Sequence, residues 1–117
     1  MVTLYGIRNC DSIKKTRRWL EQHDIDYEFY DYKKSGCPDK LITRFLKHFS
    51  YDQLINRRGT TWRQLPQSAR DNLDKTSAIA LMQQQPSLIK RPLLEIDSQW
   101  LLGLDVLRLA ELFDQPD

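Results

Sequence analysis

Short hydrophobic runs separated by mixed polar segments mark the first third of the chain. The runs VTLYGI at residues 2–7 and YEFYDY at 27–32 are rich in strand-forming and aromatic residues, and we predict that both are strands. Parallel pairing of two such strands needs a crossover of about a dozen residues or more, which the intervening segment can supply. Such crossovers are right-handed in nearly all proteins. The chain is therefore predicted to open with a strand, helix, strand unit.

The intervening segment has the periodicity of an amphipathic helix. Ile13, Thr16 and Leu20 fall on one face, whereas most of the basic residues fall elsewhere, on what we expect to be a solvated surface. Asp11 or Ser12 can cap the first turn, because short polar side chains accept hydrogen bonds from the unpaired N–H groups there.

The middle of the chain is predicted to be helical. Pro38 suits the first turn of a helix, and the apolar residues that follow it at helical spacing are Leu41, Ile42, Phe45, Leu46 and Phe49. The polar region 51–75 is expected to hold short helices around YDQLIN and PQSARDNL. Thr76 or Ser77 can then cap a helix with the sequence AIALMQQQ, which ends at Pro86.

The end of the chain predicts a hairpin and a closing helix. The runs PLLEI and QWLLG are separated only by DS, which indicates a tight antiparallel turn. Asp105 is expected to cap the last helix, whose inward-facing residues would be Val106, Leu109, Ala110 and Phe113. The full order predicts an α/β protein with a thioredoxin-like fold, in which a four-stranded mixed sheet is flanked by helices.

Length, charge and cysteine count limit the possible functions. With 117 residues and 40% hydrophobic content, the chain can form one compact domain. Its net charge of +2 is too weak to predict a nucleic-acid partner, although small anions remain candidates. No leader pattern or membrane-spanning run is present, so we expect a cytoplasmic protein without a membrane partner. We also expect it to be a monomer. Its two cysteines are then expected to be reduced, and any chemistry at them to be catalytic or redox-sensing.

Cys10 lies where the first predicted strand ends and the first helix begins. A sulfur at that junction can face unpaired backbone N–H groups and the positive end of the helix dipole, which lower the pKa of a thiol. The junction is also at the carboxyl edge of the parallel strands, where open α/β sheets bind ligands. A reactive thiolate is the interpretation that we favour, and a small buried apolar residue is the alternative.

The known cysteine motifs are incomplete around this thiol. A phosphatase-type loop would need an arginine at the sixth position after the cysteine, but Thr16 lies there and Arg17 follows one residue later. A dithiol C-x-x-C would need a second cysteine where Ile13 stands. A second thiol must therefore be Cys37 or an external thiol such as glutathione.

Arginines are candidate ligands for an anion, because the guanidinium stays charged and presents a planar fork of donors. Arg91 directly precedes Pro92, and an X-Pro bond can be cis, although a trans proline at a strand start is the commoner case. The stretch INRRGTTW at 55–62 is a second candidate, with a solvated turn as the alternative. The two histidines, His23 and His48, lack ligand spacing, so no metal site is predicted.

Together these stretches resemble the ArsC family. The resemblance is carried by LYGIRNCDSIKKTRRWL, YDYKKSG, NRRGTTWRQL, LIKRPLLE and the hairpin that leads to the final helix. It extends to arsenate reductases and Spx regulators and is strongest for the YffB subgroup, expected to be glutathione-dependent thiol reductases. The resemblance implies a single ArsC-like domain over residues 1–117. Residues 1–37 and 91–117 would form its thioredoxin-fold core, and about 38–90 a helical insertion.

The resemblance also implies a set of site residues. Cys10 matches the catalytic nucleophile, and Arg91, before a cis-proline, matches an anion-binding arginine. Arg58 matches a second one, with its neighbour Arg57 as the alternative. The residues expected to shape the cysteine loop and the anion site around it are Asn9, Asp11, Ser12 and Pro92.

These matches imply glutathione-coupled thiol chemistry on a disulfide or a small oxyanion, with no bound cofactor. The Cys10 thiolate would attack the substrate, and glutathione would resolve the mixed disulfide. Arsenate reductases of this type carry a further arginine near the hairpin, whereas SQWLLGLDVL contains none before Arg108. The competing class is a non-catalytic, Spx-like regulator that binds RNA polymerase, but Ile13 removes the second thiol of the C-x-x-C often found in that branch.

Overall fold

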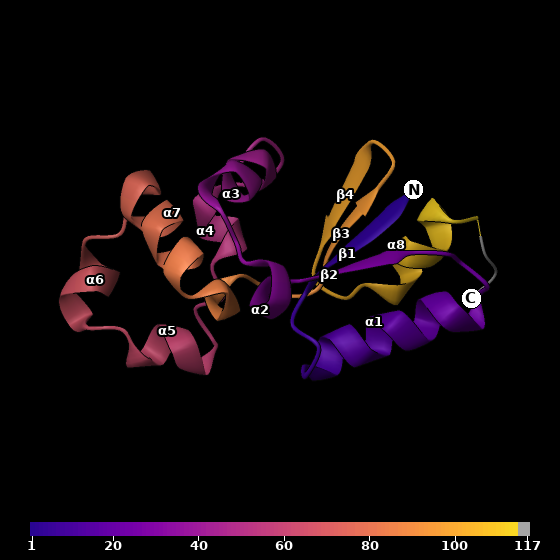
Figure 1. The fold of residues 1–117 in the computed structure, drawn as a ribbon, viewed down its shortest axis with the longest axis horizontal. Coiled ribbons are helices and arrows are strands. Elements are labelled where there is room, and N and C mark those ends of the chain that lie inside the picture. Colours follow the sequence, from indigo (N-terminus) through magenta and orange to yellow (C-terminus); the bar gives the residue numbers. More distant parts are fainter. Residues whose placement is uncertain (115–117) are drawn as a thin grey trace. The chain divides into compact units, whose positions relative to one another are not determined.

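A computed structural model of the protein describes residues 1–114 (Figure 1). The chain divides into two compact units. The first combines Met1–Tyr30 with Arg91–Asp117, and the second is Asp31–Lys90. None of the described helices has the length and apolar character needed to cross a membrane.

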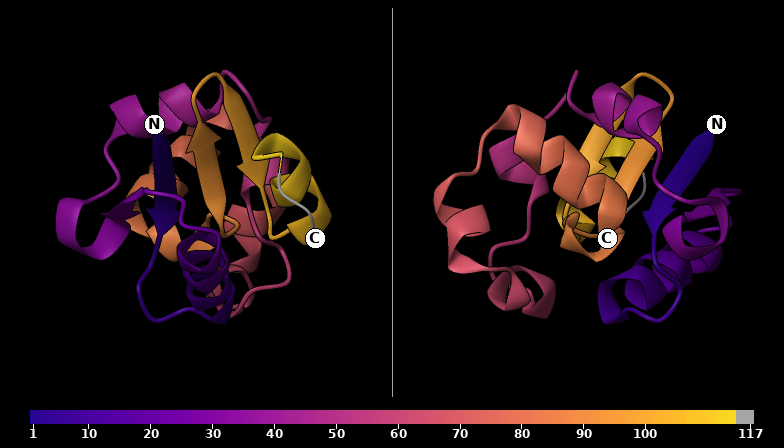
Figure 2. Two further views of the ribbon diagram at one scale, coloured as in Figure 1. Left: turned by 90° about the vertical axis from the view of Figure 1, so that its right-hand side faces the viewer. Right: turned by 60° about the vertical axis from the view of Figure 1, so that its left-hand side comes forward.

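A four-stranded sheet organises the first unit. Its strands are β1 (Val2–Gly6), β2 (Glu28–Asp31), β3 (Leu93–Ile96) and β4 (Gln99–Leu102). They lie in the order β2-β1-β3-β4, with β1 antiparallel to β3 and β3 antiparallel to β4. The sheet is mixed, as predicted, and its order is that of a thioredoxin-like fold. The predicted hairpin is confirmed, and Figure 2 shows it in orange beside the yellow C-terminal helix.

Two helices, α1 (Asp11–Gln22) and α8 (Val106–Leu112), pack on one face of this sheet. The buried residues that form this core are Val2, Leu4, Ile13, Trp19, Leu20, Leu94, Ile96, Leu109 and Ala110. Burial of each large side chain among them contributes roughly 1.5–3 kcal/mol to folding. Because side chains alternate along a strand, alternate residues of β1 and β3 point into this core.

The ends of these two helices differ in part from the sequence prediction. Asp11 and Ser12 do not cap α1, because the helix begins at Asp11 and its N-cap is Cys10, which makes no side-chain capping bond. The last helix is capped as predicted by Asp105, whose side chain accepts a hydrogen bond from the backbone N–H of Arg108. Val106 was expected to face inward but is exposed, because it lies in the first turn of α8, beyond the core.

Short helices make up the second unit. They are α2 (Tyr32–Ser35), α3 (Asp39–Phe45), α4 (Tyr51–Leu54), α5 (Thr60–Gln64), α6 (Gln67–Asp71), α7 (Lys75–Gln84) and the 3₁₀ turn η1 (Pro86–Leu88). Helices α3 and α7 pack together through fully buried side chains such as Ile42, Phe45 and Met82. An isolated antiparallel bridge joins Ile55 to Ile89.

Three predictions for this unit need correction. The α7 helix begins earlier than predicted, because Asp74 is its N-cap and forms a reciprocal capping box with Ser77. Pro38 is the N-cap of α3 rather than part of its first turn. Helix α5 was not predicted, since a helix of this length shows too little periodicity in sequence to be distinguished from a turn.

Candidate active site

Cys10 occupies the junction of β1 and α1, as predicted. Its backbone is extended, and its carbonyl accepts the first hydrogen bond of the helix from the N–H of Lys14 at 2.9 Å. The preceding strand and the helix approach closely. A Cβ atom added to Gly6 would lie 2.4 Å from Cδ1 of the buried Ile13. Glycine therefore allows the first turn of α1 to pack directly on the end of β1.

The sulfur of Cys10 is partly exposed and has two polar neighbours. The Nε of Arg91 donates a hydrogen bond to Sγ at 3.3 Å. The Oγ of Ser12 lies 3.3 Å from the same sulfur. Both neighbours belong to the same compact unit as Cys10, although Arg91 is far away in sequence. The unit thus brings together a thiol, a hydroxyl and a guanidinium.

These contacts favour the thiolate form of Cys10. Partial burial raises the pKa of the thiol, because it penalises the charged form. Hydrogen bonds from Ser12, from the backbone N–H of Ile13 and from Arg91, together with the charge of Arg91, act in the opposite direction and prevail. The pKa of Cys10 therefore lies below its ordinary value, and more of the nucleophilic thiolate is present at neutral pH.

Ser12 also links Cys10 to the segment that carries the arginine. Its hydroxyl donates a hydrogen bond to the backbone carbonyl of Arg91 at 3.3 Å. The peptide bond between Arg91 and Pro92 is cis, as the resemblance implied. Two residues that the sequence analysis did not assign to the site hold this arrangement. Gly6 allows the close packing under the helix, and Thr16 donates to the carbonyl of Ser12 at 2.6 Å.

Two other predicted residues make no such contacts. Asn9 and Asp11 flank Cys10 in sequence, but both are exposed, and within residues 1–114 neither side chain forms a hydrogen bond. Asp11 lies in the first turn of α1, where an acidic side chain interacts favourably with the helix dipole.

The second unit contains the other predicted arginine pair, at the turn between α4 and α5. The guanidinium of Arg57 pairs with Asp52 and lies over the ring of Trp62, with 4.9 Å from its Cζ atom to the ring centroid. Arg58 is held through its backbone, because its N–H donates to Asn56 Oδ1 at 3.1 Å. Among the described residues the guanidinium of Arg58 has no hydrogen-bonding or ionic partner. Of the two, Arg58 has the charge that remains available to a ligand.

Cys37 also belongs to the second unit. Its side chain is 5% exposed, and this burial raises the pKa of its thiol to about 12. Thiolate at this position is therefore scarce at neutral pH. No disulfide is formed, since both cysteines are free.

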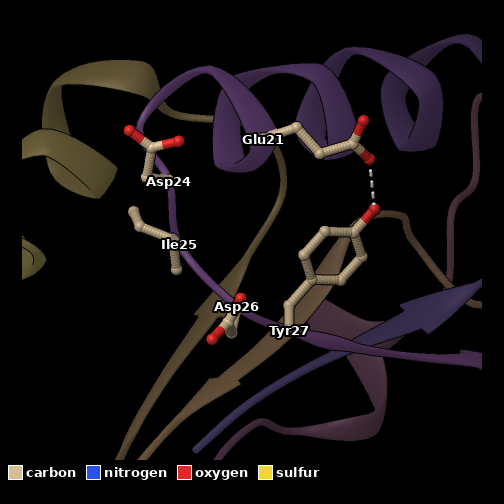
Figure 3. A pocket seen from close by; sticks show the side chains of 5 residues that line it. All are labelled: Glu21, Asp24, Ile25, Asp26 and Tyr27. Carbon is tan, nitrogen blue, oxygen red and sulfur yellow. Dashed lines mark hydrogen bonds between the residues drawn. The ribbon is translucent and has the colours of Figure 1, made fainter.

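A hollow of about 330 Å³ lies at the far end of α1 from Cys10 (Figure 3). It is lined by Glu21, Asp24, Ile25, Asp26 and Tyr27. The Tyr27 hydroxyl donates to Glu21 Oε2 at 2.6 Å. Its three carboxylates repel anions, so we do not expect an anionic substrate there. Throughout residues 1–114, no three side chains of the histidine, cysteine, aspartate and glutamate types are grouped to hold a metal ion.

The sheet is thioredoxin-like, one thiol lies at the start of its first helix, and an arginine donates a hydrogen bond to that thiol. These features define a class of thioredoxin-like proteins that carry a single cysteine at this position. A sequence profile described as the ArsC family matches residues 5–110. The chain therefore belongs to the ArsC family.

Individual relatives agree with this assignment. The structure of a YffB protein is similar with a TM-score of 0.90 and 40% identity, over 95% of this chain and 97% of that one. The solution structure of an arsenate reductase (ArsC) related protein from Brucella melitensis has a TM-score of 0.78 and 50% identity, covering 96% and 93% of the two chains. The global transcriptional regulator Spx of Listeria innocua is 34% identical over 97 residues, which are 80% of this chain and 72% of Spx.

Proposed function

We propose that the protein is a thiol-dependent oxidoreductase in which Cys10 is the nucleophile. The observation that carries this proposal is the pair of contacts at Cys10 Sγ, from Arg91 Nε and with Ser12 Oγ, each at 3.3 Å. A donor with a fixed positive charge stabilises a thiolate, and the thiolate is the species that attacks disulfides. The similarity to an arsenate reductase related protein and to a YffB protein supports the same class of chemistry.

The proposed reaction reduces a disulfide with two molecules of glutathione. The Cys10 thiolate attacks one sulfur of the substrate, forming a mixed disulfide and releasing the other sulfur as a thiolate, which takes up a proton. One glutathione thiolate then displaces the remaining substrate thiol and leaves Cys10 joined to glutathione. A second glutathione attacks that disulfide, producing oxidised glutathione and restoring the Cys10 thiolate. Two electrons pass from glutathione to the substrate, with no bound cofactor.

An external thiol fits this scheme better than Cys37 does. Since burial raises the pKa of Cys37 to about 12, its thiolate is too scarce to resolve the mixed disulfide quickly. Glutathione is abundant in the reducing cytoplasm, and we propose that the protein acts there. Because Cys10, Ser12 and Arg91 come from one chain, we propose that it acts as a monomer.

We assign anion binding to Arg91 and Arg58. Glutathione carries carboxylates, and a guanidinium binds a carboxylate through charge-assisted hydrogen bonds. Arg58 is preferred over Arg57, because the guanidinium of Arg57 is already paired with Asp52 and stacked on Trp62. A small oxyanion is an alternative substrate, and Arg91 would bind it beside Cys10.

The test compares cysteine variants in a disulfide reduction assay. The substrate is 2-hydroxyethyl disulfide with glutathione, and turnover is followed by NADPH oxidation through added glutathione reductase. Cys10→Ser is expected to lower the rate to that of glutathione alone, whereas Cys37→Ser, the matched control, keeps the wild-type rate. If Cys10→Ser kept full activity, the proposal would be wrong.

A second candidate function is a Spx-like regulator, favoured by the similarity to Spx. Such a protein binds its partner without turning over a thiol. The pH dependence of iodoacetamide labelling at Cys10 separates the two classes. An apparent pKa below that of a free thiol supports the oxidoreductase, whereas an ordinary value supports the regulator.

A further inference from the structure

A groove lies between α1 and the start of α8, within the first unit. Its volume is about 330 Å³, and its lining residues are Lys15, Arg18, Trp19, Gln22, Leu104 and Val106. None of these residues belongs to the hydrogen bonds around Cys10 Sγ. The groove is therefore separate from the candidate active site.

Three of the six residues that line the groove are apolar, namely Trp19, Leu104 and Val106. Trp19 and Leu104 belong to or pack against the core, and they leave part of their surface facing the groove. Val106 is 37% exposed, and its neighbour Leu107 is 65% exposed. These two are the large apolar side chains of α8 that are classed as exposed, and both lie at its first turn. An exposed apolar cluster beside a concave surface is typical of a binding site.

The charge at the groove is positive. Lys15 and Arg18 line it, and within residues 1–114 neither side chain forms an ion pair or a hydrogen bond. Arg18 also lines a second hollow on α1, together with Lys14, Arg17 and Glu21, so that three cations and one carboxylate continue the positive surface there. No acidic residue lines the groove. The nearby carboxylate of Asp105 is already engaged, because it accepts the hydrogen bond that caps α8.

We propose that this groove docks an acidic segment of a partner protein, with one large apolar side chain inserted between α1 and α8. The volume is suited to one or two side chains, and carboxylates on either side of the anchor would meet Lys15 and Arg18. An anionic membrane would also be attracted by the charges of Lys15 and Arg18. Val106 and Leu107 are exposed enough to touch a membrane, but a flat membrane surface would leave the concave groove unfilled, whereas a single inserted side chain would fill it.

The docking site and the thiol are independent. Arg18 follows Cys10 by eight residues on one helix, a separation of about 12 Å along the helix axis. Binding therefore does not require the Cys10 thiolate, and the experiment below distinguishes failure of this proposal from failure of the oxidoreductase proposal.

The probe is the acidic peptide acetyl-Glu-Asp-Phe-Leu-Asp-Glu-amide, titrated into the isotope-labelled full chain and followed by amide NMR. Saturable shifts are expected at residues 15–22 and 104–107. Arg18→Glu is expected to weaken the affinity about five-fold or more, because an attraction becomes a repulsion. Val106→Asp replaces an apolar lining residue with a carboxylate and should weaken binding to a similar degree. Raising the salt concentration from low to physiological values should weaken it further.

The matched control is Lys40→Glu, which reverses an exposed charge on α3 and should leave the affinity unchanged. Cys10→Ser should also bind as the wild type does. A peptide with glycine in place of phenylalanine and leucine should bind weakly. The proposal is overturned if shifts spread over all basic surfaces, if Lys40→Glu weakens binding as much as Arg18→Glu, or if the chain prefers vesicles of phosphatidylcholine and phosphatidylserine to the peptide.

Discussion

The contact between Gly6 and Ile13 can be tested by Gly6→Ala. The added Cβ would lie 2.4 Å from Ile13 Cδ1 and 2.9 Å from Cγ1. Carbon atoms pack best at about 3.5–4.0 Å, so the nearer contact overlaps by more than about 1 Å. Ile13 is fully buried and has little room to move aside. Overpacking of this kind lowers the free energy of unfolding by about 1–3 kcal/mol.

A double-mutant cycle with Ile13→Val isolates this overlap. Valine lacks Cδ1, the atom that the new Cβ would approach most closely, and the single change should destabilise the protein by about 0.5–1.5 kcal/mol. In the double variant the overlap is partly relieved. Its destabilisation should therefore be smaller than the sum of the two single effects by about 0.5 kcal/mol or more.

Urea denaturation followed by circular dichroism measures these free energies. Gly103→Ala is the control, because Gly103 has φ +90° and no atom outside its two chain neighbours lies within 4 Å of its Cβ position. That variant introduces backbone strain without touching Ile13, so its effect should add to that of Ile13→Val. Additivity between Gly6→Ala and Ile13→Val would refute the packing argument.

Four further outcomes are expected. Arg91→Met should slow iodoacetamide labelling of Cys10 at pH 7 about ten-fold. A hydrogen bond to a charged group contributes about 1.5–3 kcal/mol, and solvent screening reduces that contribution at a partly exposed sulfur. The control Lys90→Met should leave the labelling rate unchanged. Ser12→Ala should move the labelling midpoint to higher pH, because a hydrogen bond that lowers the pKa of Cys10 is removed. In the folded protein the pKa of Cys37 is about 12, which is above its value in the unfolded chain, so the folded state keeps the thiol proton to higher pH. The free energy of unfolding should therefore fall as the pH rises from about 9 to about 12. In a Cys37→Ala variant, the free energy of unfolding measured by urea denaturation should fall less steeply across that pH range. Asp105→Ala should lower the free energy of unfolding by about 1 kcal/mol through loss of the α8 cap, again measured in urea.

Local patterns were sufficient to predict most of the sheet and the long helix. Ile13, Thr16 and Leu20 were assigned to one buried face from spacing alone, and all three are fully buried. The hairpin followed from two apolar runs with only two residues between them. Both features depend on residues near each other in sequence, where hydrophobic periodicity is a direct physical signal.

Helix starts were less predictable. Several short polar residues stand near each helix start, and the choice among them depends on contacts made elsewhere in the fold. Ser12 resembles a capping residue in sequence, but its hydroxyl bonds to Arg91 and contacts the Cys10 sulfur. Asp74 gives only a weak sequence signal, because the capping box that it forms with Ser77 begins before the apolar part of the helix.

The candidate site depended on both local and distant information. The junction of a strand and a helix predicted an activated thiol at Cys10, but nothing local connects that thiol to Arg91. Their association came from the family resemblance, and the structure places the guanidinium at hydrogen-bond distance. The choice between Arg57 and Arg58 required side-chain neighbours, namely Asp52 and Trp62, which spacing does not reveal.

The Ser12 hydroxyl has one hydrogen but two possible acceptors, the sulfur of Cys10 and the carbonyl of Arg91. While the thiol keeps its proton, S–H can donate to the hydroxyl oxygen, and the hydroxyl hydrogen can point to the carbonyl. Once the sulfur is ionised, the same hydrogen is drawn to it and the carbonyl is released. Rotation about the Cβ–Oγ bond of Ser12 thus couples the charge of Cys10 to the hydrogen bond at the Arg91 carbonyl, directly before Pro92.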